Sequence, residues 1–332
     1  MSTSIPARAA SAARSASAPD ASEGAGGAPR PPSQRFGLGV ALVTPFARDG
    51  AVDLARLCAH ARRVVDDGCS SVTLFGTTGE GASIGTGQRA AMLEAMDDAG
   101  FDLRAQVLAG VAASSVEDAA AQANQLYDAG GRGILLAPPF YFKGVGDEGL
   151  YRWFASVIER CREPREVIVY HIPSITSVPL SSPLIGRLKR AFPGIVTGVK
   201  DSSGEWTNTE RLLADHADLH ILVGDERQLA RAMRQGGSGA INGFSNFCAR
   251  EILPMVERGA DVPGIAGLVD LLLRRPVTPG VKALVAHRYR DDAFVAVAPP
   301  LVPADDAARA ELAAAFDRAL PDARRARTPV PP

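Results

Sequence analysis

The chain has 332 residues, of which 46% are hydrophobic and 22% are charged, and its formal net charge is −1. A near-neutral charge with interspersed acidic and basic residues gives no broad attraction to nucleic acid or to an anionic membrane surface. No run approaches the roughly 18 consecutive apolar residues that a membrane-spanning helix needs. These properties argue against a nucleic-acid-binding or membrane-embedded protein. The length and composition indicate a globular chain that can bury a large core.

The first 34 residues are mostly Ala, Ser, Pro, Gly and Arg in low-complexity order. Such a segment has too little apolar surface to offset the entropy lost on ordering, so we expect a disordered tail over residues 1–34. The apolar core of about 7–15 residues that a secretory signal needs is absent. The composition also resembles an organellar transit peptide, but Asp20 and Glu23 weaken that interpretation.

From Phe36 onward, short apolar runs alternate with longer segments of helical periodicity, a pattern typical of βαβ units and a parallel sheet. Amphipathic helices are predicted between the strands, capped by Asp53 and Ser115 in two cases, with Gly68, Gly100 and Gly130 just past helix ends. The predicted strands span residues 39–44, 71–75, 106–109, 133–137, 167–171, 196–200, 220–223 and 239–242. The predicted helices between them span residues 54–67, 88–99, 116–129, 148–161, 183–191, 208–216 and 226–235.

This order of elements predicts an α/β fold, a (β/α)8 TIM barrel over residues 35–245. An open doubly wound sheet is the alternative, although the phosphate-binding Gly-x-Gly-x-x-Gly pattern is missing after the first strand. Further helices are predicted at residues 251–257, 265–273, 281–287 and 304–320, which indicates a small C-terminal helical domain over residues 246–332. The proline-rich run 298–303 is predicted to be a stiff linker within it, or alternatively the border of a subunit contact.

The cysteines and histidines give no metal or redox motif. The four cysteines, Cys58, Cys69, Cys161 and Cys248, are far apart without a Cys-x-x-Cys pair, so we expect reduced thiols in a cytoplasmic protein. His216 and His220 are four residues apart, but the gap is predicted to span a helix end and the next strand. We therefore expect no metal site.

The residues at strand ends are the candidates for chemistry, because the βα loops of such a barrel open on one face. Lys200 ends an apolar run, where a partly dry interior disfavours the ammonium and leaves an amine that can attack a carbonyl. The loop Gly76–Gly81 offers backbone N–H groups and two hydroxyls to a carboxylate, or is merely a tight turn.

Two tyrosines also stand at strand ends. Tyr141 and Tyr170 are expected to point a phenol at the mouth as proton carriers or hydrogen-bond donors, or else to be packed with a satisfied hydroxyl. Asp201 and Glu80 follow strands too. They could be acids that support the residues of the site, but we expect solvated loop residues.

Five segments together resemble one enzyme family. They are GTTGEGASI (76–84), PPFYF (138–142), YHIPSITSVPLS (170–181), GVKDSSG (198–204) and GDERQLARAMRQGGSGAINGFSN (224–246). In order and spacing, from about residue 36 to residue 320, they resemble the dihydrodipicolinate synthase and N-acetylneuraminate lyase family of class I pyruvate-dependent aldolases. The resemblance implies a TIM barrel with C-terminal helices, assembled as a homotetramer or homodimer. It also implies chemistry on pyruvate or another 2-keto acid through a lysine imine, with no metal and no separate cofactor.

The resemblance also implies roles for single residues. Lys200 matches the Schiff-base lysine, and Tyr170 matches the tyrosine that shuttles protons to the imine and the substrate oxygen. Tyr141 matches the tyrosine that, in the synthases, completes a hydrogen-bonded relay across the tight dimer interface.

The remaining matched positions concern substrate binding. Thr77 and Thr78, with Gly79 beside them, match the loop that holds the pyruvyl carboxylate and relays a proton. Ile241 lies where the family lines the pyruvyl pocket. Each of these roles is an expectation drawn from the family.

One departure concerns the second substrate. Ile175 stands where the synthases have an arginine that clamps a carboxylate, and isoleucine offers no charge-assisted hydrogen bond. Ser177 and Val178 also replace the usual glycine-centred continuation. We therefore expect a lyase or aldolase for a 2-keto acid, with pyruvate as product or donor and a less acidic or more apolar distal end. A 2-keto-3-deoxy sugar acid is one candidate substrate.

Three alternatives stay open from the sequence. The chain could be a 4-hydroxy-tetrahydrodipicolinate synthase, or a keto-deoxy sugar acid dehydratase that uses the same imine and expels water. The third alternative is a catalytically idle barrel that binds a keto acid as a sensor, against which the intact lysine, tyrosines and threonines argue.

Overall fold

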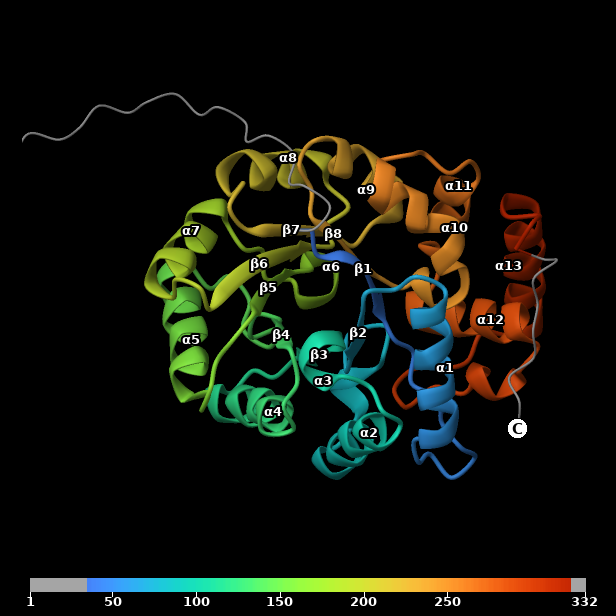
Figure 1. Cartoon of the computed structure of the whole chain (residues 1–332), viewed down its shortest axis with the longest axis horizontal. Helices are drawn as coiled ribbons and strands as arrows, with labels where there is room; N and C mark the ends of the chain where they lie inside the picture. The colour runs from blue at the N-terminus through green and yellow to red at the C-terminus, as the bar shows by residue number, and fades with distance from the viewer. Residues whose placement is uncertain (1–34, 324–332) are drawn as a thin grey trace, which may run out of the picture.

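The computed structural model describes residues 35–323, in which parallel strands close into a barrel surrounded by helices (Figure 1). The strands pair in chain order and β8 pairs with β1, so the predicted (β/α)8 barrel is confirmed. The expected tail, residues 1–34, lies outside the described residues. The strands are β1 (Gly37–Ala41), β2 (Ser71–Leu74), β3 (Val107–Val111), β4 (Gly133–Leu136), β5 (Val167–His171), β6 (Val196–Asp201), β7 (His220–Val223) and β8 (Gly239–Asn242).

The helices around the barrel begin where the sequence offers caps. Asp53 accepts a hydrogen bond from the Arg56 backbone N–H, and Ser115 accepts one from Asp118, as predicted. The helices are α1 (Leu54–Asp66), α2 (Thr86–Asp98), α3 (Leu103–Gln106), α4 (Val116–Asp128), α5 (Asp147–Arg160), α6 (Pro173–Thr176), α7 (Ser182–Ala191), α8 (Trp206–Asp215), α9 (Glu226–Arg234) and α10 (Ser245–Arg258).

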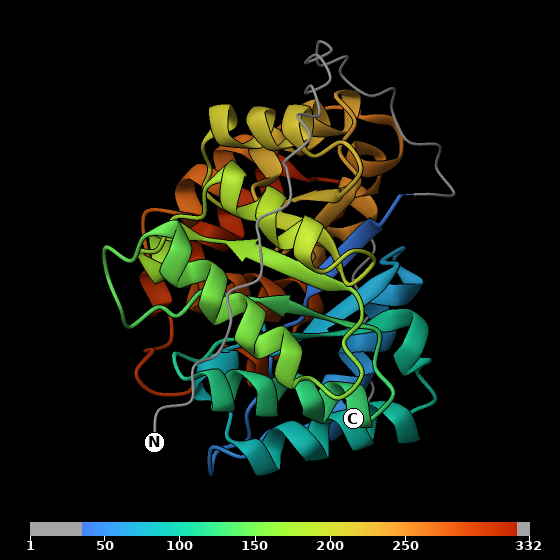
Figure 2. The same cartoon turned by 90° about the vertical axis from the view of Figure 1, so that its left-hand side faces the viewer.

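The C-terminal helices pack on one side of the barrel. They are α11 (Ile265–Leu272), α12 (Val277–Tyr289) and α13 (Asp306–Ala319). Helix α10 packs against β1 and α9, while α12 contacts both α10 and α13. In the two views α12 and α13 lie on the opposite side of the barrel from α5 and α7 (Figures 1 and 2). The expected boundary between residues 245 and 246 falls in the first turn of α10, which covers the barrel.

Two apolar layers hold the fold together. Inside the barrel, Leu108, Leu135, Ile168 and Ile241 pack with Tyr170, while a larger cluster fills the space between the strands and the helices. Both faces of a parallel strand are buried in this architecture, which is why the strands read as short continuous apolar runs.

The predicted first strand ends later than β1 does in the structure, because the apolar run continues beyond the sheet. Residues 42–44 are buried but lie beyond β1, because Val43 N–H bonds to Asn246 Oδ1 and Thr44 Oγ1 bonds to the Gly79 carbonyl. Hydrophobic runs do not distinguish a strand from a buried loop whose polar groups find side-chain partners.

Two helix starts after the barrel, those of α10 and α12, were also predicted too late, whereas the predicted start of α11 at residue 265 is confirmed. Helix α12 begins at Val277, before Pro279 and Gly280, since proline is tolerated in a first turn where its missing N–H has no partner to lose. Helix α10 begins at Ser245 and changes direction at Cys248, which has non-helical backbone angles.

The cysteines and histidines lie in structural positions. All four cysteines are free thiols. His216 follows the end of α8 and contacts Ser182, whereas His220 starts β7, as the sequence predicted. Within residues 35–323, no three His, Cys, Asp or Glu side chains gather to hold a metal ion, and no helix is long and apolar enough to cross a membrane.

Candidate active site

Lys200 and Tyr170 form the centre of the candidate site. They stand opposite each other in register on the neighbouring strands β6 and β5. Lys200 Nζ lies 3.3 Å from Tyr170 Oη and 4.3 Å from the centroid of the tyrosine ring, and each residue is 5% exposed. The structure therefore brings together an amine and a phenol in a nearly dry environment, close enough to share a proton.

Tyr170 forms part of the wall of a cavity of about 460 Å³ at the C-terminal ends of the strands. Lys200 itself is not among the lining residues, but its Nζ contacts the hydroxyl of this tyrosine. Three parts of the chain supply the walls: the loop after β2, the ends of β3 to β5 with α6, and the C-terminal region. The lining includes Phe75, Thr77, Gly110, Ala137, Phe140, Tyr170, Ile172, Ile175, Val277, Thr278, Pro300 and Leu301.

The loop after β2 has a constrained backbone. Phe75 and Glu80 have positive φ angles of 59° and 56°, a conformation that costs non-glycine residues free energy and is often found at functional sites. Gly81 permits the turn, because a Cβ there would lie 1.8 Å from the Phe75 carbonyl oxygen. Gly79 is held through its carbonyl by Thr44 Oγ1 at 2.7 Å.

The two threonines of this loop have different surroundings. Thr77 lines the cavity, and its carbonyl accepts a 3.4 Å hydrogen bond from Thr278 Oγ1 at the start of α12. Thr78 is half-buried on the side of Gly243, where an added Cβ would lie 3.5 Å from Thr78 Oγ1. The structure thus places Thr77, and not Thr78, in the cavity wall.

Glu80 is buried, so the expectation of a solvated loop residue is wrong. Glu80 Oε1 accepts a 2.6 Å hydrogen bond from Lys282 Nζ, and Oε2 accepts one of 2.7 Å from the Ala298 N–H. Lys282 also donates to the Thr44 carbonyl at 2.7 Å. The ion pair fixes the β2 loop against α12 and the segment before α13.

Asp201 is buried as well, which corrects the same expectation. Its carboxylate accepts hydrogen bonds from the Ser203 N–H at 3.0 Å, Asn208 Nδ2 at 3.0 Å and Thr209 Oγ1 at 2.8 Å. These contacts tie the end of β6 to α8 and hold the strand residue that follows Lys200.

The two isoleucines among the predicted substrate-binding residues lie at different depths. Ile241 on β8 is fully buried in the barrel interior, in the same apolar cluster as Tyr170. Ile175 on α6 is 61% exposed and lines the outer part of the cavity. The position where the synthases have an arginine is therefore at the rim of the cavity in this chain.

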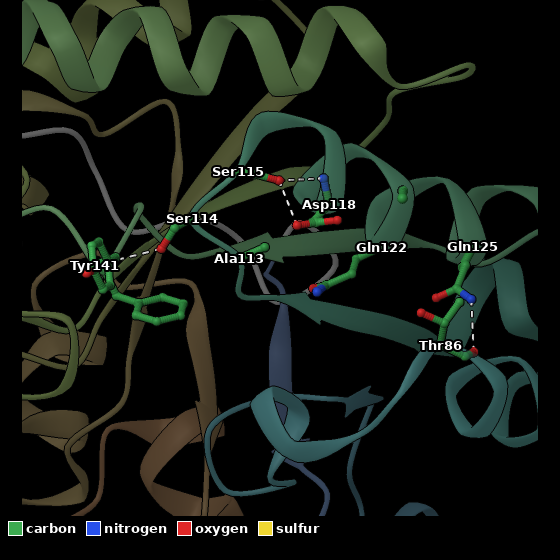
Figure 3. A pocket seen from close by; sticks show the side chains of 10 residues that line it. Thr86, Ala113, Ser114, Ser115, Asp118, Gln122, Gln125 and Tyr141 are labelled. Carbon is green, nitrogen blue, oxygen red and sulfur yellow. Dashed lines mark hydrogen bonds between the residues drawn. The ribbon is translucent and has the colours of Figure 1, made fainter.

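Tyr141 is not brought to Lys200 within one chain. It is 77% exposed and lies at a second pocket, of about 560 Å³, beside the loop after β3. Its backbone N–H donates to Ser114 Oγ at 3.2 Å (Figure 3). Phe140 lines both pockets, so the segment after β4 separates them.

Sequence reasoning did not find Lys282 and Glu226. Lys282 lies on a C-terminal helix far from the motif that it contacts, and no local pattern marked it. Glu226 starts α9, is buried near Lys200, and accepts a 3.3 Å hydrogen bond from the Phe244 N–H. Burial raises the pKa of Glu226 to about 8. Glu226 lies in the segment 224–246 that resembles the family, and this position was the signal in the sequence that could have pointed to it.

Comparison with known proteins shows the family of the chain. Residues 35–319 match the model of the dihydrodipicolinate synthetase family. A 4-hydroxy-tetrahydrodipicolinate synthase of Sorangium cellulosum is 32% identical over 85% of this chain and 95% of the relative. An uncharacterized DapA-like lyase of Chloroflexus aurantiacus is 31% identical over 86% of this chain and 97% of the relative.

A solved structure is similar over nearly its whole length. The crystal structure of dihydrodipicolinate synthase from Agrobacterium tumefaciens is 51% identical to this chain, with a TM-score of 0.84, and the match covers 86% of this chain and 99% of that one. The family's members are lyases and aldolases. The barrel, the site geometry and these matches together show that the chain is an enzyme of the dihydrodipicolinate synthetase family.

Proposed function

We propose that the protein is a class I lyase or aldolase that cleaves or forms a 2-keto acid through an imine on Lys200, with pyruvate as product or donor. The observation that carries the proposal is the buried pair of Lys200 and Tyr170, of which Tyr170 lines a cavity that the Thr77 loop also lines. Backbone N–H groups and hydroxyls of that loop can donate hydrogen bonds to a substrate carboxylate. The Lys200 amine can then attack the neighbouring keto group.

The proposed reaction uses these groups in the following order. The Lys200 amine adds to C2 of a 4-hydroxy-2-keto acid and water leaves, which gives an imine. When the C3–C4 bond breaks, its electron pair moves to C3 and forms an enamine, while the C4 hydroxyl loses its proton and C4 becomes an aldehyde. The enamine takes a proton at C3, and water then releases pyruvate and the free amine. The 3.3 Å contact between Tyr170 Oη and Lys200 Nζ supports Tyr170 as the carrier of these protons.

Borohydride reduction with pyruvate tests the proposal directly. We expect an adduct on Lys200 by intact mass and peptide mapping, and its loss in Lys200→Ala. Lys189→Ala, on α7, is the matched control and keeps the adduct. A folded protein that gives no adduct would contradict the imine mechanism.

The synthase activity is a second candidate, favoured by the printed names of relatives such as the Sorangium cellulosum protein. The exposed Ile175 at the rim argues against it, since it offers no charge to a second carboxylate. Saturable turnover of aspartate semialdehyde with pyruvate, at rates matching the best other aldehyde, would favour the synthase. Release of water without an aldehyde product would instead favour the sugar-acid dehydratase.

The assembly is part of the proposal. Phe140, Tyr141 and Phe142 are exposed large aromatic side chains in consecutive positions, which is typical of an interface. We infer a homodimer or homotetramer in which Tyr141 serves a neighbouring subunit's site, and a cytoplasmic enzyme, which the free cysteines support. Light scattering on the wild type and on Tyr141→Ala, with activity measured in parallel, tests the role of this surface.

A further inference from the structure

We propose that the outer part of the cavity is an apolar subsite, and that the partner of pyruvate is an aldehyde with an aromatic or branched aliphatic group. The inference rests on the proposed function and names its substrate class. It predicts that polyhydroxylated and acidic aldehydes, including the sugar-acid candidates, are the poorer partners.

The walls of the outer cavity are apolar side chains from segments far apart in the chain. Ile172 and Ile175 come from the end of β5 and from α6, and Phe140 comes from the segment after β4. The C-terminal region adds Pro276, Val277, Pro300 and Leu301 to the lining. An apolar group placed against these side chains is removed from water, which is favourable in proportion to the area buried.

The hydroxyl groups in the lining already have protein partners. Ser83 Oγ donates to the Pro299 carbonyl at 3.1 Å, and Thr176 Oγ1 donates to the Ile172 carbonyl at 3.0 Å. Thr278 Oγ1 donates to the Thr77 carbonyl at 3.4 Å. The other two hydroxyls of the lining are those of Thr77 and Tyr170. Both lie in the part of the cavity where the keto acid is proposed to react.

The charged groups near the cavity also have hydrogen-bond partners within the protein. Among the described residues that line it, Glu80 alone is charged, and Lys282 holds its carboxylate. Lys143 Nζ donates to the Thr176 carbonyl at 2.8 Å and to the Phe140 carbonyl, so its ammonium joins two sides of the rim. No lysine or arginine is among the lining residues, and the one cation described here at the rim, Lys143, already donates to two carbonyls.

These contacts decide between substrate classes. A polyhydroxylated chain would give up hydrogen bonds to water without replacement by side chains, and burial of an unpaired hydroxyl is unfavourable. The cavity volume of about 460 Å³ lies within the range of small-molecule sites and leaves room beyond a pyruvyl unit for a ring or a branched chain.

The test is a panel of aldehydes in the condensation direction with pyruvate. Benzaldehyde and isobutyraldehyde represent the apolar class, glyceraldehyde the polyhydroxylated class, and aspartate semialdehyde the acidic class. We expect kcat/KM for the better apolar aldehyde to exceed that for either polar class by about tenfold or more. An equal or greater kcat/KM with glyceraldehyde or aspartate semialdehyde overturns the inference.

Two variants test whether the residues at the rim of the cavity cause this preference among aldehydes. Ile175→Arg introduces a cation into the outer cavity and is expected to lower kcat/KM for the apolar aldehyde and to raise it for the acidic one. Leu273→Arg makes a similar change at an exposed position outside the lining and is expected to leave the ranking unchanged. An unchanged ranking in Ile175→Arg contradicts the subsite.

Borohydride trapping with pyruvate alone separates this inference from the proposed function. If wild type and Ile175→Arg both form the Lys200 adduct but the ranking favours polar aldehydes, only the subsite is wrong. If neither forms the adduct while circular dichroism shows folded protein, the imine mechanism itself is wrong.

Discussion

Lys282 Nζ donates a hydrogen bond to Glu80 Oε1 across 2.6 Å, although the two residues are 202 positions apart in the chain. Their side chains are 0% and 1% exposed. Burial lowers the pKa of Lys282, and the charge of Glu80 opposes that shift. The pair joins helix α12 to the loop that carries Thr77, so the C-terminal helices contribute directly to the shape of the candidate site.

Removal of one partner of this pair is predicted to destabilise the fold. Lys282→Met leaves the Glu80 carboxylate buried without its cation, which typically costs about 3–5 kcal/mol of unfolding free energy. Urea denaturation measures the loss. The double variant Lys282→Met, Glu80→Gln is expected to recover much of it, because no unpaired charge remains. Equal unfolding free energies of Lys282→Met and wild type would show that the ion pair does not contribute to stability.

The same pair is predicted to position the loop for substrate. In Glu80→Gln the side chain keeps its shape but loses its charge, so the contact with Lys282 weakens and the Thr77 loop is less well held. Because a displaced loop weakens pyruvate binding before and during reaction alike, KM for pyruvate should rise several-fold with a smaller change in kcat. Steady-state kinetics at varied pyruvate, with Glu94→Gln on the exposed face of α2 as control, measures the split.

Tyr170 is predicted to matter for proton transfer more than for binding. Tyr170→Phe removes the hydroxyl that lies 3.3 Å from Lys200 Nζ but keeps the ring in the apolar cluster. Loss of a general acid–base group usually lowers the rate by about 10²–10⁴-fold. We expect kcat to fall in this range while KM for pyruvate stays within a few-fold. A kcat within twofold of wild type would exclude the proposed role.

Two glycine substitutions are expected to act in opposite directions. Gly81→Ala places a Cβ 1.8 Å from the Phe75 carbonyl oxygen, so the β2 loop must shift and both stability and activity should fall. Gly87→Ala, in helix α2, meets no heavy atom within 4 Å and should stabilise the protein by about 0.5–1 kcal/mol. Thermal unfolding of the two variants tests the contrast, and equal melting temperatures would contradict it.

Glu226 is predicted to make stability depend on pH. Burial raises its pKa from the ordinary 4.5 to about 8, so between these values the folded chain binds a proton that the unfolded chain has released. The contribution of Glu226 is therefore fully present below pH 4.5 and is lost as pH rises through about 8. The slope is at most about 1.4 kcal/mol per pH unit.

Urea denaturation from pH 5 to pH 8 checks the effect of Glu226. Glu226→Gln is neutral throughout and should show a flatter dependence of unfolding free energy on pH than wild type. Glu94→Gln, an exposed carboxylate replaced in the same way, is the matched control and should follow wild type. Identical slopes for Glu226→Gln and wild type would mean that the buried carboxyl does not hold the extra proton.

Much of the fold could be predicted because its signals are local. Apolar runs such as Val167–His171 and amphipathic segments such as Leu54–Asp66 specify β5 and α1 within their own few residues. Short elements escaped prediction: α3 and α6 have four residues each, too few for a periodicity to show. The first turn of α12 escaped because Pro279 and Gly280 resemble a loop.

The sequence by itself determined the strand order, and with it the placement of Lys200 and Tyr170 on neighbouring strands, because in a parallel barrel consecutive strands pair and their C-terminal ends meet on one face. The tertiary structure alone decided which distant groups meet there: Lys282 with Glu80, the C-terminal segment in the cavity wall, and Tyr141 outside it. Such contacts depend on how helices pack after the barrel closes, and a buried charge finds its partner across space without any spacing rule along the chain.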